Sequence, residues 1–258
     1  MRKVVLLTAA IILFAATFTL AEAQEDKKLG VTFDLTYMSK YMSKGSESYG
    51  QQPRLIETVY FDLWGTGFGV AFGHQASTSS GYVEKQRFNY KVYYGSSILD
   101  GTPYKTKYKF SWEYKNYYGR ARNKGNSQEW ISSLSWPEIL PVENLAPYYI
   151  VHYEHPSGSG YNNYKNSGWA HRFGLGYDLT VPELSNPLHL SAEIVYRDGL
   201  GGPTKDHDWS HATFGIATNF KLNDRLSFVP GLYYQESMDD SVCKRDVIYC
   251  KLSLKYRF

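Results

Sequence analysis

The sequence predicts an all-β protein, a single antiparallel transmembrane β-barrel of about twelve strands after an N-terminal signal peptide. Three observations predict this fold class. An export signal opens the chain, and apolar and polar side chains then alternate with period two. The connections between these segments alternate between short and long. Together they are typical of a barrel in which each strand turns one face to lipid and one to the interior.

The first 23 residues have the composition of a signal peptide. Arg2 and Lys3 precede an apolar run over residues 4–20, and Ala21-Glu22-Ala23 fits an A-x-A cleavage site. Cleavage there would leave residues 24–258 as the mature barrel, a single domain. The apolar run is long for such a signal, so an uncleaved anchor helix is the alternative.

The composition of the remaining chain fits a membrane barrel. Aromatic residues make up 17% of the sequence, with 24 Tyr, although the mean hydropathy is only −0.44 and no second apolar run is long enough for a spanning helix. A net charge of +3 is too small to indicate a nucleic-acid partner. Two cysteines, Cys243 and Cys250, are too few for a disulfide scaffold, and a bridge between them stays open.

In each of the first six predicted strands, alternate side chains are apolar and therefore lie on one face. They cover residues 29–41, 55–63, 67–74, 87–95, 104–115 and 129–136. The fifth shows the pattern most clearly, because Tyr108, Phe110 and Trp112 alternate with lysines. A helix would scatter these aromatic side chains around its circumference, whereas a strand places them on one face. The sixth is the weakest, with Trp130 and Leu134 outward.

The last six predicted strands follow the same rule. They cover residues 145–154, 169–181, 188–197, 211–222, 225–236 and 247–258. The final segment, CKLSLKYRF, alternates to its end and finishes on Phe258. A terminal aromatic residue on an alternating last strand resembles the signal that the outer-membrane barrel assembly machinery recognises. We therefore expect this machinery to be a partner through Phe258.

The connections predict the orientation. Short or apolar connections lie at 64–67, 96–103, 137–144, 182–187 and 222–225, and long polar ones lie at 43–53, 75–86, 116–128, 155–168, 198–210 and 237–246. Bacterial outer-membrane barrels have short periplasmic turns and long outer loops. This pattern predicts an even number of strands, both termini on the periplasmic side, and all six long connections outside the cell.

The start of the mature chain resembles one family. VTFDLTYMSKYMSKG is similar to the first strand of the TorF-type porin family of small Gram-negative outer-membrane barrels, with Ser39, Lys40, Tyr41 and Gly45 matching its pattern. Met42, Ser43 and Lys44 depart from it, where the family has Val, an aromatic residue and Arg. The resemblance covers one strand closely, and it implies a channel in the bacterial outer membrane.

Catalytic and metal-binding patterns are sparse. A lipid hydrolase at the outer rim would need a Ser beside a His, and Ser132 and His171 are outward candidates two strands apart. The stretch KDHDWSH offers Asp206, His207, Asp208 and His211 to a divalent ion, but neighbouring Gly and Pro residues oppose the helical turn that this spacing needs. The sequence therefore predicts neither an enzyme nor a metal or cofactor.

The inward face carries the main functional signal. On the face opposite the apolar side chains, basic groups outnumber acidic ones. The predicted pore-lining residues are Lys91, Lys105, Lys107, Lys109, Glu113, Lys115, Arg172, Glu193, Arg197, Lys251, Lys255 and Arg257. We expect a porin-like channel for passive diffusion of small solutes, with anions favoured, surrounded by outer-membrane lipid. The alternative is an occluded structural or adhesive barrel whose outer loops bind a partner.

Overall fold

The computed structural model describes residues 28–47, 52–78, 86–117, 126–157, 167–201 and 207–258. The predicted signal peptide at 1–23 and the candidate ligand Asp206 lie outside these residues. Within the described part of the chain, no helix is long and apolar enough to cross a membrane.

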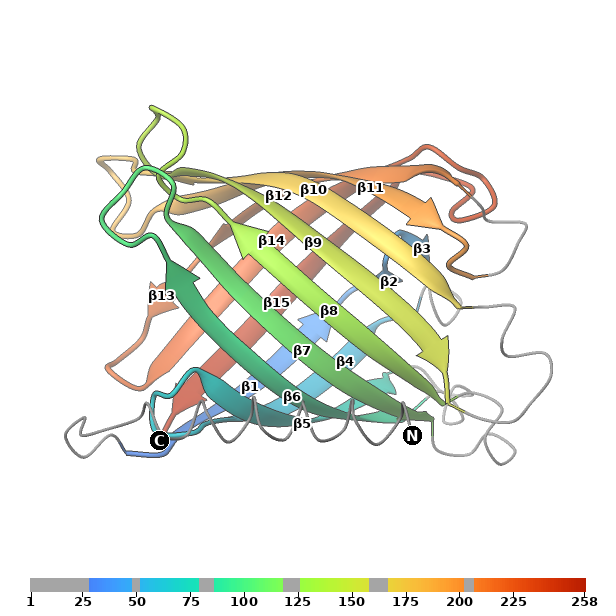
Figure 1. Ribbon diagram of the computed structural model, residues 1–258, viewed down its shortest axis with the longest axis horizontal. Helices are drawn as coiled ribbons and strands as arrows, with labels where there is room; N and C mark the ends of the chain where they lie inside the picture. The colour runs from blue at the N-terminus through green and yellow to red at the C-terminus, as the bar shows by residue number, and fades with distance from the viewer. Residues whose placement is uncertain (1–27, 48–51, 79–85, 118–125, 158–166, 202–206) are drawn as a thin grey trace, which may run out of the picture.

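Twelve strands form one closed antiparallel barrel (Figure 1). Each strand pairs with its neighbours in chain order, and β15 pairs with β1 to close the ring. The wall consists of β1 (Gly30–Met38), β4 (Arg54–Asp62), β5 (Phe68–Ser77), β6 (Arg87–Ile98), β7 (Thr106–Tyr117), β8 (Ser127–Ser135), β9 (Leu145–Pro156), β10 (Gly168–Leu179), β11 (Leu188–Asp198), β12 (Asp208–Thr218), β14 (Leu226–Ser237) and β15 (Val247–Arg257). The short β13 (Phe220–Lys221) continues the line of β12.

All twelve predicted strands are confirmed, with ends that differ by a few residues. The weakest prediction, 129–136, is β8, and the segment 104–115 is β7. Closure is required because an unpaired strand edge cannot be satisfied in hydrocarbon. The short connections predicted between β4 and β5, β6 and β7, β8 and β9, β10 and β11, and β12 and β14 all lie at the end of the barrel where β1 begins and β15 ends.

The outer face is apolar, as the alternation predicts. Phe110 of β7 and Trp130 of β8 are 50% and 56% exposed in mid-strand, where a water-soluble sheet would cover them. Two polar residues on this face, Glu57 of β4 and His74 of β5, are directly paired across the strands, with Nδ1 and Oε2 3.3 Å apart. Each therefore gives the other a hydrogen-bonding partner outside the barrel wall.

The inner face changes from one end of the barrel to the other. Near the short turns, Lys107 and Lys109 of β7 are exposed to the interior space. Towards the long connections, Glu113 and Lys115 of the same strand are buried. A barrel of constant radius does not explain this difference, so an additional segment must fill the lumen at the long-connection end.

That segment is the start of the first long connection, and the sequence wrongly assigns its residues 43–47 to the outside of the barrel. Residues 42–47 form a small hairpin, β2 (Met42–Ser43) with β3 (Ser46–Glu47), that lies inside the wall (Figure 1). Polar contacts to four wall strands hold it there. We call residues 42–47 the lumen hairpin.

The two cysteines, Cys243 and Cys250, are both free thiols. Cys243 is buried in the connection before β15, where its Sγ donates a hydrogen bond to the carbonyl of Arg245 over 3.3 Å. Cys250 lies in β15 opposite Leu232 of β14.

Candidate functional site

The tip of the lumen hairpin is a two-residue turn. Ser43 pairs with Ser46, and between them Lys44 and Gly45 have φ angles of 49° and 81°. Positive φ at both central residues is the geometry of a type I′ turn, whose twist matches that of paired strands. At Gly45 the space is also closed, because an added Cβ would collide with the imidazole of His211. Glycine is therefore needed there for both conformation and room.

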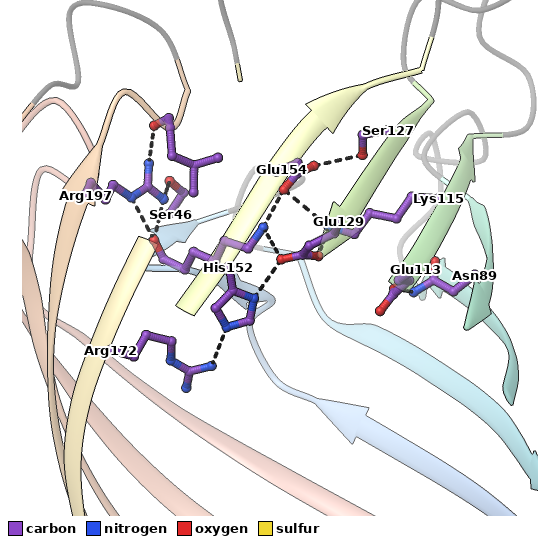
Figure 2. A network of polar contacts seen from close by, with 12 residues as sticks. Ser46, Asn89, Glu113, Lys115, Ser127, Glu129, His152, Glu154, Arg172 and Arg197 are labelled. Carbon is purple, nitrogen blue, oxygen red and sulfur yellow. Dashed lines mark hydrogen bonds and ion pairs between the residues drawn. The ribbon is translucent and has the colours of Figure 1, made fainter. Parts of the chain in front are cut away.

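The side chain of Lys44 ties this tip to one side of the barrel wall. Its ammonium lies 2.6 Å from Oε1 of Glu129 on β8 and also contacts Glu154 on β9. Lys115 on β7 pairs with the same two carboxylates (Figure 2). We call these four residues the lumen charge cluster. Positive and negative groups alternate in it, which offsets the cost of removing each charge from water.

Further polar groups fix the two carboxylates. Ser127 donates a hydrogen bond to Glu154 over 2.8 Å, and Nδ1 of His152 lies 2.7 Å from Glu129. On the other side of the imidazole, Nη1 of Arg172 lies 3.4 Å from Nε2. A guanidinium can only donate, so Nε2 of His152 accepts and Nδ1–H donates to Glu129. This arrangement favours the tautomer of His152 that carries its proton on Nδ1.

The backbone of the same tip is tied to other strands. The Lys44 carbonyl accepts hydrogen bonds from Arg197 on β11, with Nε at 3.1 Å, and Ser46 accepts one at 3.0 Å (Figure 2). The Gly45 carbonyl accepts a buried hydrogen bond of 2.8 Å from Nε2 of Gln235 on β14. The tip is thus held from β8 and β9 through a side chain, and from β11 and β14 through its backbone.

The entry to the hairpin is held on a third side. The guanidinium carbon of Arg54 lies 4.3 Å from the ring centroid of Tyr41. Arg87 donates a hydrogen bond of 2.9 Å to the Tyr41 hydroxyl and another of 3.0 Å to Tyr117. Arg54 lies on β4 and Arg87 on β6. Of these two strands, β6 lies five strands around the ring from both β11 and β14, so the segment crosses the lumen.

The hairpin leaves two cavities in the lumen, which share Met42, Lys44 and Arg172 as lining residues. The first, of about 330 Å³, is bounded mainly by β4–β9 and includes Arg87, Lys91 and Lys115. The second, of about 210 Å³, is bounded mainly by β9–β15 and includes Tyr148, Tyr233 and Tyr249. We call them the cation cavity and the tyrosine cavity. The interior is therefore polar and hollow beside the hairpin.

Half of the predicted pore-lining residues gather around this hairpin. They are Lys91, Glu113, Lys115, Arg172, Glu193 and Arg197. Glu113 lies between Lys91, at 2.7 Å, and the amide of Asn89, at 2.6 Å. Arg172 and Glu193 form their own pair at 2.9 Å.

The other predicted pore-lining residues lie towards the short turns. Lys107 and Lys109 are exposed, and the Lys109 ammonium lies 4.0 Å from the ring centroid of Tyr93. Lys251 and Arg257 are exposed on β15, where Lys255 lies 3.8 Å from Asp34.

Lys105 precedes β7 at the rim, and its ammonium lies 3.1 Å from Asp100. Hydrogen bonds from Ser97 and Lys105 lower the pKa of Asp100 below its usual value.

Sequence reasoning missed several residues that form the site. They are Tyr41, Lys44, Gly45, His152 and Gln235, and the pattern of the sequence does not reveal them because it predicts an outer loop over the residues that follow Met42. The one available signal was the Lys44-Gly45 pair between two short polar stretches, which a two-residue turn can use.

The alternative chemical sites are dispersed in the structure. Ser132 and His171 both pair with Val151, so they lie on the same row with β9 between them, and Nδ1 of His171 lies 2.7 Å from the Tyr149 hydroxyl. His207 pairs with Asp198 at 3.0 Å, whereas His211 lies inside the barrel beside Ser210 at 2.7 Å. Among the described residues, no three His, Cys, Asp or Glu side chains group as metal ligands.

Comparisons with known proteins agree with the fold. No family model matches the chain, and no curated protein matches its sequence. Among solved structures, the NanC porin superposes with a TM-score of 0.52 at 9% identity, over 88% of this chain and 100% of that one. An outer membrane channel from Pseudomonas putida F1 gives 0.49 at 10% identity, over 92% and 99% of the two chains. Outer membrane phospholipase A from Escherichia coli gives 0.47 at 11%, over 92% and 95%.

The fold and the outer face together define the class of this protein. A closed twelve-stranded antiparallel barrel with an apolar exterior and a charged interior is an outer-membrane β-barrel. At these identities the likeness to the solved barrels extends to the fold alone.

Proposed function

We propose that this barrel is a narrow channel for passive diffusion of small solutes across the bacterial outer membrane, with a preference for anions. The observation that carries the proposal is the hollow, charged lumen on both sides of the hairpin. A barrel that served only as a scaffold could fill its interior with apolar side chains, as small barrels do. Here the interior keeps two polar cavities of about 330 and 210 Å³.

The expected selectivity follows from the charges that a solute meets first from the short-turn end. Lys107 and Lys109 project from β7 into the open part of the lumen, and Lys91 lies further in on β6, opposite Glu113. A charge in a narrow tube acts on a passing ion through a lower effective dielectric than at a free surface. The two exposed lysines should concentrate anions and repel cations, and added salt should weaken both effects.

Planar bilayer recordings under a KCl gradient test this proposal. The wild-type channel should give a reversal potential of anion-selective sign, and Lys107→Glu with Lys109→Glu should move it towards cations. Lys105→Glu is the matched control, because this lysine lies at the rim beside Asp100 and should have a smaller effect. Cation selectivity that ignores the double replacement would contradict the proposal.

One observation favours the alternative of an occluded barrel. The lumen hairpin is held from β8, β9, β11 and β14, and Tyr41, which precedes it, is held from β4 and β6, so the two together close part of the cross-section. If the barrel is occluded, the wild-type protein should show no conductance under any gradient. The same recordings therefore separate the two functions.

Export and assembly belong to the same proposal. We propose that the chain leaves the cytosol through its signal peptide and enters the outer membrane through the barrel assembly machinery, which recognises Phe258. The ring of Phe258 is 75% exposed, while its N–H donates to the Val31 carbonyl over 3.1 Å. The side chain is thus accessible at the seam where the first strand, β1, pairs with the last strand, β15.

A further inference from the structure

The tyrosine cavity differs in chemistry from the cation cavity across the hairpin. Five of its twelve lining residues carry hydroxyl groups, namely Tyr148 on β9, Ser191 on β11, Thr213 on β12, Tyr233 on β14 and Tyr249 on β15. A hydroxyl group can donate one hydrogen bond and accept others, so such a lining can meet either need of a ligand.

The charged groups at this cavity already have partners of opposite sign. Nε of Arg172 lies 2.9 Å from Oε1 of Glu193, and the hydroxyl of Tyr148 donates to Oε2 of Glu193 over 3.0 Å. The ammonium of Lys44, which also reaches the cavity, is paired with Glu129 and Glu154 on its other side. A charged ligand would have to compete with these pairs, whereas an uncharged one would not.

The rings of two tyrosines form an aromatic surface on the wall. Tyr233 and Tyr249 are directly paired across β14 and β15, and their rings stack with centroids 5.2 Å apart and an interplanar angle of 14°. The Tyr233 ring covers two glycines, because a Cβ built on Gly215 or Gly231 would lie 2.7 or 2.9 Å from its atoms. Glycine at both positions lets the ring lie against the backbone of the wall.

From these features we infer that the tyrosine cavity is a binding site for an uncharged, polyhydroxylated solute of the sugar or sugar-alcohol class. The hydroxyls of such a solute match the hydroxyl lining, and its C–H faces can pack on the tyrosine rings. The cavity volume of about 210 Å³ limits the ligand to a small molecule. The inference rests on the proposed channel, which brings the solute to the site.

Isothermal titration calorimetry of the full-length barrel in detergent micelles tests the site, with D-glucose and sodium acetate as probes. Glucose should bind saturably and acetate should not. The double variant Tyr233→Phe, Tyr249→Phe removes two hydroxyls and leaves the rings, so it should weaken glucose binding roughly tenfold, at about 1 kcal/mol or less for each lost hydrogen bond.

Tyr234→Phe is the matched control, since this tyrosine lies on the outer face of the same strand and donates its hydroxyl to Asp246 over 2.8 Å. It should bind glucose as the wild type does. The absence of glucose binding by the wild type, an unchanged affinity in the double variant, or acetate binding as tight as glucose would each overturn the inference.

The channel is judged separately by KCl conductance. A barrel that conducts but binds no glucose overturns the sugar site alone, and one that binds glucose but does not conduct overturns the proposed channel.

Discussion

The ammonium of Lys44 lies 2.6 Å from the carboxylate of Glu129, and this contact joins the tip of an internal hairpin to the barrel wall. The two residues are far apart in the chain, and the wall residue is 4% exposed. Because Glu154 and Lys115 complete the same cluster, the hairpin position depends on charges that β7, β8 and β9 contribute together.

Replacing Lys44 by Met should loosen the hairpin and raise the conductance. Removing one partner of a buried charged pair costs about 2 kcal/mol or more, and we take the lower value because the Glu154 side chain is 23% exposed. That energy shifts the ratio of seated to displaced hairpin by roughly thirtyfold. Single-channel recording should show a larger or less stable open level. The control variant Lys244→Met, in an exposed connection, should leave the conductance unchanged. If the conductance of Lys44→Met is also unchanged, the hairpin is not the constriction of the channel.

Gly45 and Gly101 provide a matched pair of glycine substitutions. Both have positive φ, 81° and 78°, but an added Cβ meets the His211 ring at Gly45 and nothing within 4 Å at Gly101. Alanine should cost about 1 kcal/mol of backbone strain at either site. Only Gly45→Ala should also displace the hairpin from its seat. Equal conductance in the two variants would show that the contact with His211 does not hold the hairpin.

The sequence was sufficient to predict the strands of the barrel wall, but it was insufficient to predict the position of the lumen hairpin. The reasons are physical. Alternation in β7 predicts which side chains face lipid, because that follows from local geometry and the apolar medium. The position of Lys44 depends on carboxylates of β8 and β9, which are more than 80 residues away in the chain. A polar, Gly-containing connection has the same composition whether it lies in water outside the barrel or among charges inside it.

The facing of the last strand can be tested by a reciprocal exchange. Leu254 of β15 is 40% exposed on the outer face, whereas Lys255 points inward within 3.8 Å of Asp34. Leu254→Lys puts a charge towards lipid, which costs roughly 2–4 kcal/mol at mid-depth. It should reduce the heat-modifiable folded barrel in the membrane fraction, and Lys255→Leu should have a smaller effect. Equal losses would contradict the assigned faces.

The orientation in the membrane can be tested with two serines. Ser241 lies exposed in the long connection before β15, and Ser185 lies exposed in a short turn. In a background with Cys243→Ser and Cys250→Ser, a cysteine at position 241 should react with an impermeant maleimide on intact cells, and one at position 185 should not. Labelling of position 185 alone would reverse the topology.

Asp246 gives a prediction about pH. Hydrogen bonds from the Ser237 N–H and the Tyr234 hydroxyl lower the pKa of this exposed carboxyl. Its ionised form therefore stabilises the connection between β14 and β15 at neutral pH, and this contribution is lost as the pH falls through the lowered pKa. Tyr234→Phe should raise the pKa, as measured by NMR titration of the carboxyl carbon, and Tyr233→Phe inside the barrel should not. A pKa that is the same in all three proteins would refute the role of the Tyr234 hydroxyl.

The seat of the lumen hairpin has a consequence for the order of folding. The hairpin follows β1, the first strand of the wall, while Gln235, which binds its Gly45 carbonyl, belongs to β14, the last strand but one. The ring closes only when β15 pairs with β1. The contact between Gln235 and the Gly45 carbonyl can form only after β14 has been made and has joined the wall. The hairpin is therefore made directly after the first strand of the wall, but all its contacts are complete only when one of the last strands is in place.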